Sequence, residues 1–172
     1  MTDTVFLFIV AIVFLVLQTI SLAALISGPY KPDLMVSLIV WSGMHTPFSA
    51  GICCAFGIGL LVDIFSGGQL GLFAITYTII FVLTASVHEY LEIDTWPGRF
   101  LCVGAATLLS GAIVGGIRMV ADPAPWEIQP MIWFIGKALT TSLAALAVFP
   151  FLDRGWATYC RLVGVHRDSG PE

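Results

Sequence analysis

The stretch LMVSLIVWSGMHTPFSAGICCAFGIGLLV, residues 34–62, runs for 29 residues without Asp, Glu, Lys or Arg. The hydrocarbon core of a bilayer takes about 20 helical residues. One straight helix over the whole stretch would be about 43 Å long, which exceeds that thickness. Gly43 and Thr46-Pro47 interrupt its middle, and Pro47 suits the first turn of a new helix. The stretch therefore predicts two membrane helices, residues 32–45 and 47–65.

Four further apolar segments flank this pair, and glycine, proline or charged residues separate them. The polar segment 88–99 is the clearest loop. Because the chain contains no long hydrophilic segment, we expect one membrane domain over residues 1–172, with a short polar tail at 153–172. The predicted fold class is all-α, with six transmembrane helices in one bundle, over residues 5–26, 32–45, 47–65, 70–87, 100–117 and 126–152.

Composition agrees with a membrane protein and argues against several other classes. Hydrophobic residues make up 58% of the chain and charged residues 10%, whereas a soluble domain has about 45–50% and about 25%. The formal net charge of -4 lacks the basic excess of a nucleic-acid-binding protein. The four cysteines show no CxxC spacing, so neither a disulfide framework nor a zinc site is indicated. Since no catalytic constellation, cofactor motif or phosphate-binding loop is found, we expect no enzyme and no cofactor.

The distribution of basic residues predicts the orientation of the helices. Six spans put both termini on one side of the membrane, and the same side then holds Arg99, Arg154, Arg161 and Arg167. Lys31 lies on the other side, where Arg118 ends its span. Because Lys and Arg concentrate in cytoplasmic segments, we expect both termini in the cytoplasm. An unbroken helix over 34–62 would instead give five spans and separate the termini.

Small residues recur at helical spacing on three of the expected spans. They let a neighbouring helix approach closely, either within the same chain or from a partner protein. Both interpretations stay open for the three stripes, which consist of Gly51, Ala55 and Gly59 on the third span, Thr107, Gly111 and Gly115 on the fifth, and Gly136, Thr140 and Ala144 on the sixth.

Asp63 is the most informative charged residue, because a carboxylate near a membrane helix is costly unless it is solvated or paired. One hypothesis pairs Asp63 with Arg118 or Lys137 and so ties three helices together. The alternative binds its carboxylate to local backbone amides at the turn Ser66-Gly67-Gly68. Asp33 follows Pro32 at a helix start, where a carboxylate is favoured as a cap.

Two motifs together resemble the MreD family of bacterial rod shape-determining membrane proteins. The first is Lys31-Pro32-Asp33-Leu34, and the second is GLLVDIFSGGQLG at residues 59–71. The similarity runs from about residue 31 to 90. Carried over by position, it marks as motif residues Asp33, Asp63, Gly67, Gly68 and Gly71.

The resemblance implies a non-enzymatic role in cell shape and lateral cell-wall elongation. It implies a place in the bacterial inner membrane beside MreC, whose single transmembrane helix would bind the bundle. MreB, RodA and a class B penicillin-binding protein would follow through the same elongasome, which synthesises peptidoglycan. The family fold is similar to that of the substrate-binding subunits of energy-coupling-factor transporters. A vitamin-binding capture subunit of such a transporter is therefore the alternative function.

Overall fold

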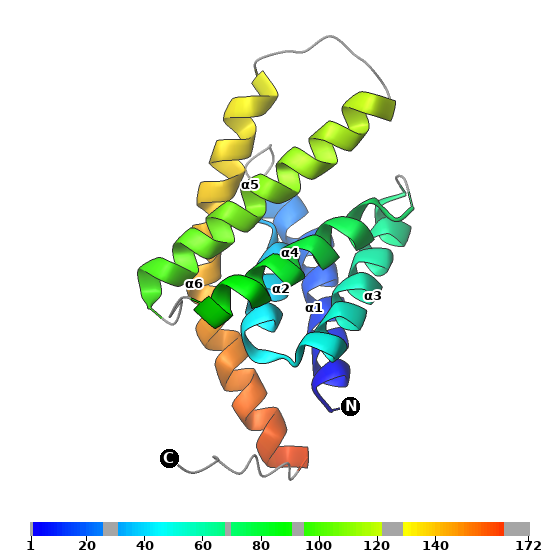
Figure 1. Ribbon diagram of the computed structural model, residues 1–172. Helices are drawn as coiled ribbons and strands as arrows, with labels where there is room; N and C mark the ends of the chain where they lie inside the picture. The colour runs from blue at the N-terminus through cyan, green and yellow to red at the C-terminus, as the bar shows by residue number, and fades with distance from the viewer. Residues whose placement is uncertain (1, 26–30, 68–69, 91–94, 122–128, 164–172) are drawn as a thin grey trace.

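The computed structural model describes residues 2–25, 31–67, 70–90, 95–121 and 129–163, and the described residues form helices without strands (Figure 1). The helices are α1 (Thr2–Leu25), α2 (Leu34–His45), α3 (Phe48–Ser66), α4 (Leu72–Tyr90), α5 (Trp96–Ala121) and α6 (Gln129–Val163). Over these described ranges, the prediction of an all-α chain with six helices is confirmed.

Local sequence explains where α2 and α3 begin and end. Asp33 is the N-cap residue of α2, and its side chain accepts a hydrogen bond from the Val36 amide. Thr46 is extended and Pro47 precedes α3, so the long apolar stretch divides where proline disfavours a continuous helix. Gly67 ends α3 with a φ of 63°, a left-handed conformation that glycine adopts without steric cost.

The last helix is longer than the sequence suggested. The expected span ended at residue 152 and a polar tail followed, but α6 continues through Asp153 to Val163. Aromatic packing explains the extension, since the rings of Trp156 and Tyr159 lie 5.1 and 5.3 Å from that of Phe6 on α1. Pro150 lies inside α6 without ending it, as membrane helices tolerate.

In the part of the chain that the structure describes, three helices have segments long and apolar enough to cross a membrane. These segments are Phe48–Ser66 in α3, Trp96–Ile117 in α5 and Ile135–Arg161 in α6. The other three helices carry shorter apolar stretches, at Thr4–Thr19, Leu34–His45 and Leu72–His88. By length alone, α2 reaches only about 18 Å.

The short helix α2 is the centre of the bundle. Its residues from Met35 to Gly43 are all buried, and it packs against α1, α3, α4, α5 and α6. Outside this core, large aliphatic side chains such as Ile9 and Val13 on α1 and Leu143 on α6 are about half exposed. An apolar exterior around an apolar core is what a bilayer stabilises and water does not.

Two polar clusters mark opposite ends of the bundle. Asp33 at the start of α2 contacts Lys137 of α6, and Asp63 at the end of α3 contacts the start of α4. We call this the Asp33 end. At the other end, Asp153 of α6 accepts hydrogen bonds from Trp41 of α2, at 2.7 Å, and from Arg99 of α5, at 3.3 Å. The start of α1 and the end of α6 lie on this Asp153 side (Figure 1).

Candidate functional site

Asp63 ties α3 to the first turn of α4. Its Oδ2 accepts from the Gly71 amide at 2.9 Å and the Ala74 amide at 3.2 Å, and its Oδ1 accepts from the Phe73 amide at 3.0 Å. The first amides of a helix have no partner within the helix, and its positive end favours a carboxylate. Asp63 is only 1% exposed, so these three bonds stabilise a charge that the interior would otherwise disfavour.

The motif glycines around Asp63 supply the geometry of this contact. Gly71 has a φ of 95°, and Gly67 has a φ of 63°, so both occupy conformations that other residues rarely adopt. An added Cβ would meet no atom within 4 Å at either position, so backbone conformation and not space demands glycine there. Gly68, the remaining motif glycine, lies outside the described residues.

Lys137 contacts Asp33 and not Asp63, which corrects one expected ion pair. The Lys137 Nζ lies 2.9 Å from Asp33 Oδ2. Sequence spacing did not show that α2 begins beside α6, so Asp33 was expected to act only as a cap. Both oxygens of Asp63 are occupied by amides, at positions 71, 73 and 74. The side chain of Arg118, the other expected partner of Asp63, lies outside the described residues.

A hydrogen-bonded loop strengthens the contact between α2 and α6. The Asp33 amide donates to Thr141 Oγ1 at 3.0 Å, and the Thr141 hydroxyl donates to the Lys137 carbonyl at 2.7 Å. The backbone and the side chain of Asp33 therefore both bond to one turn of α6. This arrangement fixes the start of the central helix against α6.

The small-residue stripe on α3 packs against α4 within the same chain. Ala55 is completely buried, and a Cβ added at Gly59 would lie 2.4 Å from the Ala74 Cα. A Cβ added at Gly51 would lie 2.0 Å from the ring of Phe81. These contacts leave no room for another helix, so this stripe serves intramolecular packing.

The stripe expected on α5 is only partly buried. Thr107 is 4% exposed, and its hydroxyl donates to the Val103 carbonyl of its own helix at 2.8 Å. Gly111 and Gly115 are half-buried. Nearby, a Cβ added at Gly104 would lie 3.0 Å from Ser142 Oγ, which shows how closely one face of α5 approaches α6.

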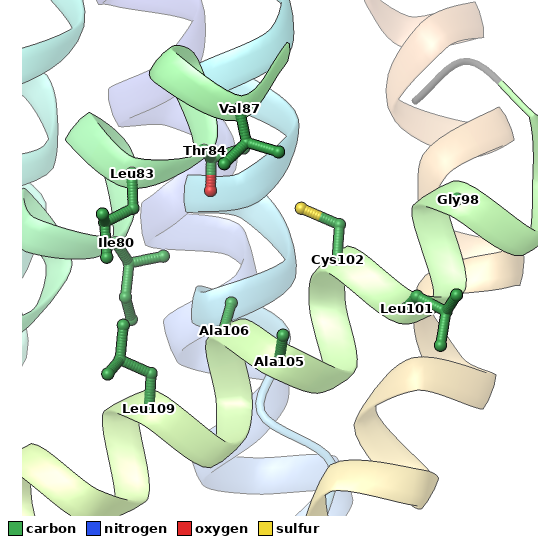
Figure 2. A pocket seen from close by; sticks show the side chains of 10 residues that line it. All are labelled: Ile80, Leu83, Thr84, Val87, Gly98, Leu101, Cys102, Ala105, Ala106 and Leu109. Atoms are coloured by element: carbon green, nitrogen blue, oxygen red, sulfur yellow. The ribbon is translucent and has the colours of Figure 1, made fainter. Parts of the chain in front are cut away.

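The open apolar surface lies on another face of α5, where a groove of about 500 Å³ separates it from α4 (Figure 2). We call it the α4–α5 groove. Its α5 wall carries small side chains, and larger aliphatic side chains stand along α4 and at the ends of the groove (Figure 2). The residues that line it are Ile80, Leu83, Thr84, Val87, Gly98, Leu101, Cys102, Ala105, Ala106 and Leu109.

Sequence reasoning missed this groove, although a signal was present. Gly98, Cys102 and Ala106 recur every four residues, which is the same small-residue spacing as in the stripes that were singled out. The expected start of the fifth span at residue 100 placed Gly98 in a loop. Because α5 begins at Trp96, all three residues lie on the helix.

The model of the family described as rod shape-determining protein MreD matches residues 2–152. The chain belongs to the MreD family. This MreD-family chain is therefore a rod shape-determining membrane protein, in agreement with its apolar helices. No curated protein and no solved structure matches it. In this MreD-family chain, the α4–α5 groove and the two polar clusters are the features to which a function can be assigned.

Proposed function

We propose that this chain is a non-enzymatic inner-membrane scaffold that binds the transmembrane helix of MreC in the α4–α5 groove. Through MreC it joins the elongasome with RodA, a class B penicillin-binding protein and MreB, and supports lateral peptidoglycan synthesis. Membership of the rod shape-determining family supports the cellular role.

The groove is the observation that carries the proposed partner contact. Transmembrane helices associate through close van der Waals packing, and small residues let the two backbones approach. Gly98, Ala105 and Ala106 supply such a surface on α5, while Leu83 and Leu101 supply larger side chains that would pack beside a guest helix. The rival small-residue surface, on α3, is already covered by α4.

The proposed topology has six membrane crossings with both termini in the cytoplasm. The two polar clusters support it. The start of α2, the end of α3, the start of α4 and Lys137 of α6 lie at the Asp33 end, whereas Trp41 of α2, Arg99 of α5 and Asp153 of α6 meet at the other end. The Asp153 end holds Arg99 and Arg154, so the positive-inside rule assigns it to the cytoplasm. The short α2 crosses inside a ring of the other five helices, where bilayer thickness does not limit it.

Co-purification of MreC with tagged variants tests the proposal. Ala105→Phe puts a large ring into the groove from an exposed position, so we expect the recovery of co-expressed MreC in mild detergent to fall at least roughly fivefold. Ala112→Phe is the matched control, because Ala112 is also exposed on α5 but does not line the groove. The control should recover MreC at the wild-type level.

Two outcomes would contradict the proposal. Equal MreC recovery with both variants would show that the groove does not hold the partner. Recovery of a second integral subunit with paired ATPases, in place of MreC, would favour a vitamin-capture subunit of a transporter.

A further inference from the structure

Two adjoining cavities follow the contact between α1 and α3. The first, of about 280 Å³, lies at the Asp33 end, and the second, of about 270 Å³, lies further along both helices toward the middle of the bundle. The side chains of Leu15, Met35 and Phe65 line both cavities, so the two spaces meet at a shared wall. Along α1 they extend over residues 11–19, about 12 Å of helix. We call them together the α1–α3 cavity.

The walls of the α1–α3 cavity change from apolar to polar along its length. Toward the middle of the bundle only apolar side chains line it. Two of them, Ile12 and Val16, are 54% and 46% exposed, so this part opens to the outer surface of the bundle, where lipid chains lie. At the end of the bundle the walls carry polar side chains, namely Gln18, Thr19, Asp33, Ser66, Tyr77 and Lys137. The headgroup and the acyl chain of a membrane lipid follow in the same order.

The charged pair in the polar part selects the kind of headgroup. The Nζ of Lys137 can donate three hydrogen bonds, and among the described residues it donates one, to Asp33 Oδ2 at 2.9 Å. The Lys137 side chain stays 36% exposed, so its remaining donors can reach a phosphate oxygen, which binds an ammonium group well. Because the Asp33 carboxylate keeps the net charge of the pair at zero, a headgroup that carries both signs fits better than a purely anionic one.

We propose that the α1–α3 cavity binds one zwitterionic glycerophospholipid of the phosphatidylethanolamine type. One acyl chain lies along the apolar walls of α1 and α3, the phosphate accepts from Lys137 Nζ, and the headgroup ammonium lies on the Asp33 side of the pair. The bound lipid stabilises the contact of α1 with α3 beside the start of the central helix. None of the residues that line this cavity lines the α4–α5 groove, so the site is separate from the proposed MreC contact.

Native mass spectrometry of the delipidated full chain in detergent tests the headgroup. Three dioleoyl lipids are offered at equal concentration: phosphatidylethanolamine, phosphatidylglycerol, which has a net negative charge, and diacylglycerol, which has no phosphate. We expect the complex with one phosphatidylethanolamine to be at least roughly fivefold more abundant than either other complex, because each of the other lipids lacks a charge contact. Equal abundance of the three complexes would overturn the proposal, since it would show non-specific lipid contact. A preference for phosphatidylglycerol would overturn it as well.

Two tryptophan variants on α1 test the location. Ile12→Trp puts a large side chain into the apolar part of the cavity, and we expect the phosphatidylethanolamine complex to fall at least roughly fivefold. Val13→Trp is the matched control, because Val13 is 48% exposed on the same helix but does not line the cavity. The control should bind the lipid at the wild-type level. Equal lipid binding by the two variants would place the lipid elsewhere and contradict the proposal.

A third variant tests the phosphate contact. With Lys137→Met, the complexes of phosphatidylethanolamine and diacylglycerol should become equally abundant. A preserved preference in the folded variant would overturn the assignment of the headgroup to Lys137. The wild-type comparison and the two tryptophan variants decide even where Lys137→Met fails to fold. Since the assay contains no MreC, its failure would leave the proposed function standing.

Discussion

Helix α4 contacts both α3 and α5, and it meets these two helices in opposite ways. Toward α3, glycine and alanine bring the two backbones so close that an added Cβ at Gly59 would touch Ala74. On the side toward α5, an open groove of about 500 Å³ lies between the two helices, and glycine, cysteine and alanine of α5 line it (Figure 2). Small-residue spacing therefore predicts a close approach, but it does not predict whether the approaching helix belongs to the same chain.

Polar contacts explain why one interface closes. Asp63 accepts hydrogen bonds from three amides at the start of α4 and so fixes the junction between α3 and α4. From this junction the two helices pack along their length. The α5 helix is instead held by α6, through the close contact at Gly104 and the ion pair between Arg99 and Asp153. Because α5 packs along α6, its opposite face diverges from α4. That face of α5 stays exposed.

The largest expected effect comes from breaking the closed interface. Gly59→Leu would force a side chain into the backbone of α4, and backbone cannot shift as a side chain can. Overpacking usually costs about 1–3 kcal/mol, and we expect at least the upper value here. Size-exclusion chromatography and the thermal midpoint of the detergent-solubilised protein measure the effect. Gly116→Leu is the control, since a Cβ there meets no atom within 4 Å. A wild-type midpoint for Gly59→Leu would refute the close-packing argument.

The second effect concerns the corner between α3 and α4. Asp63→Ala leaves three amides without their charged acceptor, and we expect a loss of about 2–3 kcal/mol in the free energy of unfolding. Asp63→Asn keeps one acceptor oxygen and should fall between Ala and the wild type. Denaturant titration followed by tryptophan fluorescence measures the order. The exposed Ser66 gives the control Ser66→Ala, which should change little. Equal stability of Asp63→Ala and the control would remove Asp63 from the account of the closed interface.

A smaller effect distinguishes the two carboxylates at the Asp33 end. In a double-mutant cycle, Asp33→Asn and Lys137→Met should show a coupling of about 1 kcal/mol, because their charges are in contact. The same cycle with Asp63→Asn and Lys137→Met should be additive within about 0.5 kcal/mol. Coupling of Lys137 to Asp63, with none to Asp33, would instead support the ion pair between Asp63 and Lys137 that the sequence suggested.

The smallest effect on stability is expected in the groove. Ala105→Phe changes an exposed side chain, so the free energy of unfolding should stay within about 0.5 kcal/mol of the wild-type value. The same thermal scans that reveal the collapse of Gly59→Leu measure it. A large destabilisation by Ala105→Phe would mean that the groove closes within the chain, and the contrast between the two faces of α4 would disappear.

Much of the fold could be predicted from residues that lie close together in the sequence. The break at Thr46-Pro47, the cap at Asp33 and the glycine turn after Ser66 depend on residues a few positions apart, and all three appear where local chemistry indicates. Where a helix end lacks such a signal, its predicted position was less accurate. The extension of α6 beyond residue 152 depends on Phe6, which lies almost 150 positions earlier in the sequence.

Prediction of the candidate sites was limited in the same way, because their contacts join residues that are far apart in the sequence. Small residues, Asp63 and Lys137 were visible in the sequence, but their partners were not. Lys137 and Asp33 are 104 residues apart, and no pattern along either helix shows that they meet. A cavity beside Asp33 and Lys137 is lined by side chains from five helices or their ends, so spacing within one helix could not reveal it.

The helical, membrane-type character of this protein follows from the amino-acid sequence alone, because hydropathy, proline and capping residues act locally. The sequence also identifies the family, through the motifs around Asp33 and Asp63 and the match over residues 2–152. Helix packing, by contrast, sets which small-residue face is closed and which carboxylate Lys137 neutralises. Those outcomes depend on how tilted helices meet in space, and the relative placement of helices is a property of the whole bundle.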